Sequence, residues 1–187
     1  LVPNEAIPRG SKTGEPLRFG ILTWTDMFTP RQLLCHLTTI EALQDAKPQI
    51  LEELGYERGR AVITYLQFAI DKVLDYNSRQ TRWEYTRGII KGGFGRHDFS
   101  LKWTFGEMSY SGSSSGLTWG LNQVLDAYHG LSELTQNVDQ KNHEKCIRLL
   151  NSSSTNINLV PDSSVDAIVM DPPYYDNVQY CELSVFY

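Results

Sequence analysis

The sequence contains only three cysteines, Cys35, Cys146 and Cys181, and no two of them are close along the chain. A structural zinc site needs four converging ligands, commonly supplied in part by a Cys-x-x-Cys pair, so a zinc ribbon within this chain is excluded. The low and odd count is typical of proteins from a reducing compartment. We therefore interpret the cysteines as small apolar residues with free thiols, and we expect no metal site.

Long apolar runs are also missing. The run at residues 165–170 is interrupted by Asp166 and is far shorter than the ~20 residues that span a bilayer. The first residues do not have the basic and apolar pattern of a signal peptide, so we expect a soluble, cytoplasmic protein. The 187 residues suffice for one domain, 17–187, preceded by an extended lead-in over 1–16.

The chain has no excess of positive charge, since its formal net charge is −5. A protein that binds nucleic acid normally presents a basic surface, but a local concentration of cations can supply one. Residues 77–106 contain six lysines and arginines and only two acidic residues. The same region contains Trp83, Trp103 and Phe105. Two interpretations stay open: contacts to a nucleic-acid backbone and splayed bases, or a solvated face whose aromatic side chains serve the core.

Helices are expected where apolar residues recur at helical spacing. Thr29 can cap a helix over 30–46 with a proline at its first position, and Pro48 should interrupt it and begin a short helical turn that stops at Gly55. A clear apolar stripe predicts a helix over 57–75, and a similar stripe predicts one over 117–136.

Three further patterns favour ordinary structural roles. Residues 17–24 are expected to form a short strand or a buried extended piece. The glycine-rich residues 92–95 lack the preceding strand and following helix of a phosphate-binding loop, which favours a flexible turn. The four histidines are scattered, which favours surface or capping roles over metal binding or general-base catalysis.

The end of the sequence carries the strongest functional signal. A short strand is expected near 145–151, and the apolar, β-branched residues 165–170 predict a buried central strand of an α/β sheet. Asp171 follows it, at the strand end where such sheets bind ligands. Pro172 and Pro173 then remove two N–H donors and leave backbone carbonyls free, and Tyr174 adds a flat aromatic face.

These groups suit an exocyclic amine such as adenine N6. The Asp171 carboxylate and the Pro172 carbonyl could accept the two amine hydrogens and orient the weakly nucleophilic nitrogen. Tyr174 would stack on the base, a contact worth ~1–3 kcal/mol. Positioning the amine against an electrophilic methyl group would supply the rest of the acceleration, and a base in a duplex must first be flipped out.

Residues 171–174 resemble the Asp-Pro-Pro-Tyr motif of S-adenosylmethionine-dependent amino methyltransferases. The longer stretch 171–184 is similar to a group of adenine-specific DNA methylases, large proteins described as containing a zinc ribbon. The segments 24–32 and 95–107 also resemble parts of that group, so the likeness extends over most of the chain from about Phe19 onward.

This resemblance implies a partial Rossmann-like methyltransferase fold with a helical insertion over about 30–136, and S-adenosylmethionine as the methyl donor. DNA is the implied partner. The residues implied to engage the target amine are Asp171, Pro172, Pro173 and Tyr174. Tyr175 and Asn177 are assigned to substrate binding. Phe28, Thr29 and Pro30 are similar to a segment that lies near the methionine end of the cofactor.

The sequence departs from the family in two respects. The glycine-rich cofactor loop is absent, and the chain stops just after the motif, so we expect it to work with the remainder of a longer methylase chain. Alternative functions are methylation of cytosine N4 in DNA or of a guanine amine in RNA. A further alternative is a catalytically silent, nucleic-acid-binding fragment.

Overall fold

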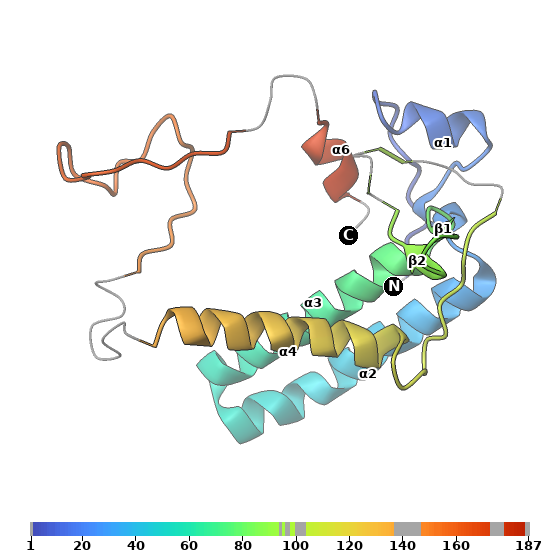
Figure 1. Cartoon of the computed structure of the whole chain (residues 1–187), viewed down its shortest axis with the longest axis horizontal. Coiled ribbons are helices and arrows are strands. Elements are labelled where there is room, and N and C mark those ends of the chain that lie inside the picture. The colour runs from blue at the N-terminus through green and yellow to red at the C-terminus, as the bar shows by residue number, and fades with distance from the viewer. Residues whose placement is uncertain are drawn as a thin grey trace.

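The computed structural model describes residues 2–93, 95, 98–99, 104–136, 147–172 and 178–185. Its elements follow each other as α1 (Gly14–Arg18), the 3₁₀ helix η1 (Trp24–Met27), α2 (Pro30–Leu54), α3 (Tyr56–Tyr76), β1 (Arg82–Glu84), β2 (Ile89–Lys91), α4 (Gly116–Leu134) and α6 (Tyr180–Ser184) (Figure 1). The three long helices make up most of the ordered structure. The fold is therefore mixed helical with one small sheet.

Helix α2 begins as the sequence predicts. Thr29 adopts an extended backbone, its hydroxyl accepts a hydrogen bond from the Gln32 N–H at 3.2 Å, and Pro30 occupies the first turn. Gly55 ends the helix with a φ of 74°, which favours glycine. The predicted interruption at Pro48 is wrong, because α2 continues through it to Leu54. The helix tolerates the missing N–H because Pro48 lies on its exposed side, where water can satisfy the freed carbonyl.

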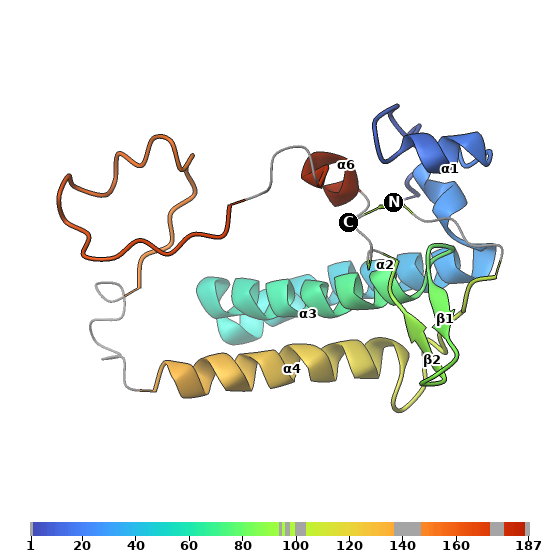
Figure 2. The same ribbon diagram turned by 45° about the horizontal axis from the view of Figure 1, so that its top comes forward.

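The helices predicted over 57–75 and 117–136 are confirmed as α3 and α4. Helix α3 packs against α2 on one side and α4 on the other, so it is the central member of the group (Figure 2). Gly120 allows the close approach of α4, because a Cβ there would lie 2.6 Å from the Ala69 carbonyl oxygen. The backbones of α3 and α4 thus meet almost directly.

The hydrophobic core lies where the N-terminal segment meets η1. Ile7, Ile21, Trp24, Met27 and Phe99 are buried in one cluster. Partly buried side chains of α1, α3 and α6 pack around it. The short strand predicted over 17–24 is not formed, because α1 and η1 occupy both ends of this range. Only an isolated bridge joins Thr23 to Ala6 among the described residues. The alternative, a buried extended piece, is confirmed at Ile21.

The one sheet among the described residues is an antiparallel hairpin of β1 and β2. Both strands lie in the connection between α3 and α4. No parallel sheet is present in the described part of the chain, so the Rossmann-like fold stays a prediction.

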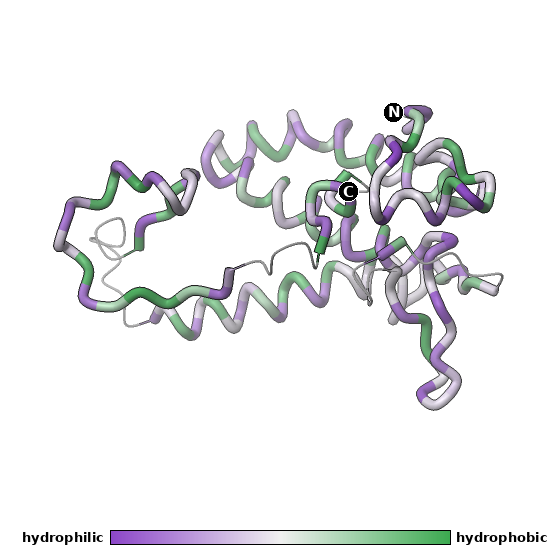
Figure 3. The backbone as a smooth tube through the Cα atoms, turned by 90° about the horizontal axis from the view of Figure 1, so that it is seen from above, coloured by the Kyte–Doolittle hydropathy of each residue, from purple (hydrophilic) through white to green (hydrophobic). Residues whose placement is uncertain are grey.

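The predicted strand at 165–170 is wrong in this structure. The segment 147–172 has no helix or strand, and Figures 1 and 2 show it standing clear of the helices; its apolar residues are green in Figure 3. Val169 is 96% exposed and Ile168 is 76% exposed. The physical reason is the lack of a partner: a central strand forms only between neighbouring strands, and no described segment lies beside this one. The strand expected near 145–151 is likewise absent from its described part, 147–151.

Among the described residues, none of the helices combines the length and the apolar character needed to cross a bilayer.

Candidate functional site

An apolar cavity of about 380 Å³ lies beside the start of α2. Its lining comes from the N-terminal segment, η1, α2, α3 and the residue after α6: Pro3, Glu5, Trp24, Phe28, Leu33, His36, Leu37, Ile40, Leu74 and Val185. A volume of this size with few polar groups is typical of a small-molecule site. Phe28, one of the three residues predicted to lie near the cofactor, is part of this wall.

His36 is the polar group held inside this wall. Its Nε2 donates to the Asn77 carbonyl oxygen at 2.9 Å, and its Nδ1 lies 3.3 Å from the Tyr110 hydroxyl. Phe28 and Tyr110 both meet the imidazole edge to face. Burial lowers the pKa of His36, and the hydrogen bond to Asn77 opposes this shift. The ring is therefore neutral at pH 7, and the predicted surface role for this histidine is wrong.

The sequence analysis missed this buried network because its members come from three separate segments. His36 has apolar neighbours at helical spacing, Asn77 begins a run of five polar residues, and Tyr110 lies in a serine-rich loop. The run at 77–81 was the available signal. Polar residues directly after an apolar helix can be buried if they bond to a neighbouring segment, and here Asn77, Ser78, Gln80 and Thr81 are all buried.

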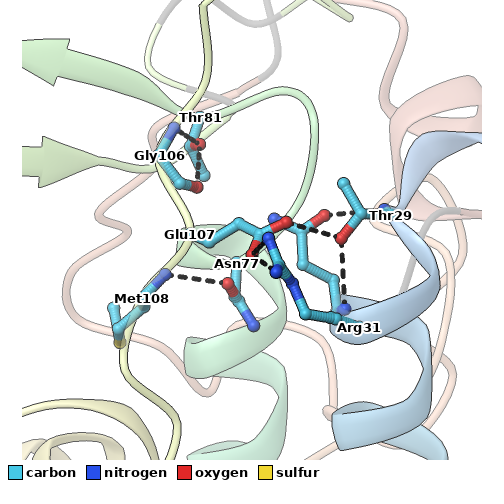
Figure 4. Close-up of polar contacts among 8 residues, drawn as sticks. Thr29, Arg31, Asn77, Thr81, Gly106, Glu107 and Met108 are labelled. Atoms are coloured by element: carbon cyan, nitrogen blue, oxygen red, sulfur yellow. Dashed lines mark hydrogen bonds and ion pairs between the residues drawn. The ribbon is translucent and has the colours of Figure 1, made fainter.

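Thr29 serves the architecture of the helix start (Figure 4). Its hydroxyl donates to Glu107 Oε1 at 2.7 Å while it accepts from the Gln32 N–H. The other oxygen of Glu107 binds the Arg31 guanidinium, with a distance of 2.9 Å to its terminal nitrogen. Pro30 is exposed, and neither it nor Thr29 lines the cavity. Of the three residues assigned to the cofactor, the structure places only Phe28 at a cavity.

The chemistry of the lining can be compared with that of S-adenosylmethionine, the cofactor implied by the resemblance. Phe28 and Trp24 offer the flat apolar contacts that an adenine ring needs, and the carboxylate of Glu5 can accept hydrogen bonds from ribose hydroxyls or from an ammonium group. The cofactor also carries a carboxylate, for which a cationic side chain is the usual partner. No arginine or lysine is among the described residues that line this cavity.

The structure does not bring the motif to this cavity. Asp171 and Pro172 are exposed and belong to the segment 147–172, which lies at the opposite end of the molecule from α1 (Figure 2). Pro173, Tyr174, Tyr175 and Asn177 lie outside the described residues. The described part of the motif thus presents a carboxylate and a backbone carbonyl to solvent.

The end of the family-like stretch has an anchoring role. Glu182, on α6, accepts hydrogen bonds from the backbone N–H groups of Ser11, Lys12 and Thr13 at 2.9, 2.8 and 3.1 Å. The carboxylate thereby caps the segment that leads into α1. This contact joins residues about 170 positions apart and fixes where the chain re-enters the core after the motif.

The glycine-rich residues 92–95 do not form a phosphate cradle. The Asp75 carboxylate accepts a hydrogen bond from the Gly93 N–H at 2.8 Å, and a Cβ on Gly92 would overlap that carboxylate. The Gly93 N–H, which a phosphate cradle would use, is therefore already bound. The predicted turn is confirmed at Gly93 and Gly95, and its Gly93 N–H is tied to Asp75 of α3.

A metal site is not found among the described residues, where no three histidine, cysteine or acidic side chains come close enough to share an ion. Comparisons of the chain with models of protein families, with curated proteins and with solved structures find no match.

Proposed function

We propose that the chain belongs to an S-adenosylmethionine-dependent methyltransferase that acts on the N6 amine of adenine in DNA. The observation that carries the proposal is the sequence Asp171-Pro172-Pro173-Tyr174 at the end of an apolar, β-branched run.

The work of the motif is to hold the amine. The Asp171 carboxylate accepts one N6 hydrogen and the Pro172 carbonyl accepts the other, which turns the nitrogen lone pair out of the ring plane. Tyr174 stacks on the base, with Tyr175 and Asn177 as further contacts. The carboxylate also stabilises the positive charge that the nitrogen gains as it attacks.

The donor would supply the electrophilic methyl group. Within the described residues, Phe28 and Glu5 are the side chains best placed to hold its flat and its hydrogen-bonding parts. The proposal requires the segment 165–172 to gain neighbouring strands, because only a paired and covered strand buries its apolar side chains and directs Asp171 into a cleft. The remainder of a longer chain is the proposed source of those strands, and the cytoplasm the proposed location.

Two other planar amines are alternatives for the same motif: cytosine N4 in DNA and a guanine amine in RNA. The test is methyl transfer from isotopically labelled S-adenosylmethionine to mixed-sequence DNA and RNA, followed by mass spectrometry of the nucleosides. The proposal expects label in N6-methyladenine from DNA. Label confined to RNA, or to cytosine, would overturn the adenine assignment.

A second candidate function is a catalytically silent chain that only binds nucleic acid. The exposed, unpaired state of 165–172 favours it, since the motif carboxylate here faces solvent and lies far from the cavity. Calorimetric titration with S-adenosylmethionine separates the two candidates. Binding of one cofactor per chain supports the methyltransferase, whereas the absence of binding heat at millimolar cofactor supports the silent chain.

A further inference from the structure

The β1–β2 hairpin exposes two aromatic side chains. Trp83, in the middle of β1, is 59% exposed, and Tyr85, at the start of the turn, is 84% exposed. Single exposed aromatic residues are common on protein surfaces. Two of them within three positions of one short hairpin form a larger apolar surface, whose contact with water is unfavourable in free energy. This surface has no partner in the described part of the chain.

The base of the hairpin is held firmly, so the aromatic side chains stand on a fixed support. The Gly106 N–H donates to the Thr81 hydroxyl oxygen at 3.0 Å, and that hydroxyl lies 2.9 Å from the Gly106 carbonyl. Ile90 packs closely against Gly106, where an added Cβ would lie 2.7 Å from its side chain. An isolated two-stranded hairpin is marginal in water, and these contacts supply what it lacks.

Cations occupy the other face of the same hairpin. Arg82 pairs in register with Lys91, and Trp83 pairs with Ile90, so the two pairs project on opposite faces. Arg82, Lys91 and Arg87 of the turn line a hollow of about 360 Å³. One interpretation of residues 77–106 was a solvated face without a binding role. That interpretation does not explain why three cationic side chains line one hollow.

The local charge is positive although the whole chain is acidic. Glu84 is bound by Lys91 and by the Thr86 hydroxyl, which lowers its pKa and keeps it ionised within the hairpin. Neither Arg82 nor Arg87 forms an ion pair with a described carboxylate, and among the described residues that line the hollow Asp75 alone is acidic. Two guanidinium groups are therefore available to a polyanion.

We propose that the β1–β2 hairpin binds an unpaired stretch of a nucleic-acid strand, with Trp83 and Tyr85 stacking on bases and Arg82 and Arg87 contacting phosphates. Among the described residues β1 pairs with β2 alone, so an extended strand that crosses the other edge of β1 would have its bases on one face and its phosphates on the other. In a duplex the bases are stacked on each other and closed to both aromatic rings, so the hairpin should prefer single strands.

A single nucleic-acid strand fits this surface better than a protein does. Exposed aromatic rings next to unpaired arginines match alternating bases and phosphates, the pattern of sequence-tolerant binders of single strands. A protein partner would need acidic residues spaced to meet both arginines as well as an apolar patch. The surface shares no residue with the motif at 171–174, so it remains testable whether or not the chain transfers methyl groups.

The experiment measures binding by fluorescence anisotropy, without cofactor, to a labelled single strand of about 16 nucleotides and to the matching duplex. We expect tighter binding to the single strand. Trp83→Leu and Tyr85→Leu should each weaken it about 5- to 100-fold, the loss of one stacked base. The matched control is Tyr56→Leu at the start of α3, where the tyrosine is 64% exposed, and it should leave the affinity unchanged.

The salt dependence tests the phosphate contacts. Arg87→Gln should lower the slope of log affinity against log salt by about 0.7, the value for one phosphate contact on a single strand, while Arg58→Gln on α3 should not change it. Equal or tighter binding of the duplex, or unchanged affinity in both aromatic variants, would overturn the proposal. Asp162→Asn, a change in the exposed segment 147–172 that leaves both the hairpin and the motif intact, should bind as the unaltered chain does.

Discussion

Glu182 and Thr13 join the two ends of the described chain: the Thr13 N–H and hydroxyl both lie within 3.3 Å of Glu182 Oε2. The contact fixes α6 against the segment before α1. It also means that the last part of the family-like stretch contributes to stability, because the carboxylate satisfies backbone groups that would otherwise be unpaired.

Glu182→Gln should lower the free energy of unfolding by about 1 kcal/mol at pH 7, as for other capping side chains. Burial would raise the pKa of Glu182, but the three backbone N–H donors and the Thr13 hydroxyl together lower it below its ordinary 4.5. The stabilisation is therefore complete above pH 4.5 and is lost as the pH falls through the lower folded-state value. Chemical denaturation at pH 7 and pH 3 measures both effects, with Glu133→Gln on exposed α4 as the control.

His36 should make the fold sensitive to mild acid. Its pKa is lowered by burial from 6.5, so the unfolded chain binds a proton more readily than the folded chain does below that pH. Stability should be constant above pH 6.5 and should decrease as the pH falls through the folded-state pKa. His36→Gln removes this titration and should flatten the profile between pH 5 and 7. A profile of the His36→Gln variant identical to that of His129→Gln, a change at an exposed histidine, would contradict the assignment.

Two glycines of α4 should respond in opposite ways to alanine. At Gly130 nothing lies within 4 Å of an added Cβ, so Gly130→Ala should stabilise the protein by about 0.5–1 kcal/mol through helix propensity. At Gly120 the added Cβ would meet the Ala69 carbonyl and Val73, so Gly120→Ala should destabilise by about 1–3 kcal/mol. Thermal unfolding of the two variants measures the difference. Stabilisation by both would show that α4 does not pack closely on α3.

Thr29 provides a test of capping against cofactor binding. Thr29→Ala should cost about 1 kcal/mol of stability, because the Gln32 N–H and Glu107 lose their partner. Thr29→Ser keeps the hydroxyl and should keep the stability. Affinity for S-adenosylmethionine, measured by calorimetry, should be the same in both variants. If Thr29→Ala loses affinity for S-adenosylmethionine at temperatures where the variant stays folded, Thr29 contacts the cofactor and the capping role alone is contradicted.

Much of the helical structure could be predicted from sequence, because each helix carries its own signals. Thr29, Pro30 and Gly55 mark the ends of α2 by local hydrogen bonding and backbone preference, and apolar spacing marks α3 and α4. The continuation of α2 through Pro48 could not be predicted, since it depends on whether the freed carbonyl faces water.

The candidate site was harder to predict because its parts depend on contacts between distant segments. The burial of His36 depends on Asn77 and Tyr110, and the lack of a strand at 165–170 depends on the lack of a neighbour to pair with. An apolar run indicates that a segment is suited to burial. Whether it is buried depends on what other strands lie beside it.

The role of Asp171 in methyl transfer is the central claim, and the initial rate of label transfer from S-adenosylmethionine to adenine-containing DNA tests it most directly. Assayed together with the neighbouring strands that the proposal requires beside 165–172, the unaltered chain should label adenine N6, and Asp171→Asn should reduce the rate on the order of 100-fold or more, as the loss of one stabilising group at a reacting centre does. Asp162→Asn, in the same exposed segment, should retain the full rate. Equal rates for Asp171→Asn and the unaltered chain, or no label with either, would contradict the account.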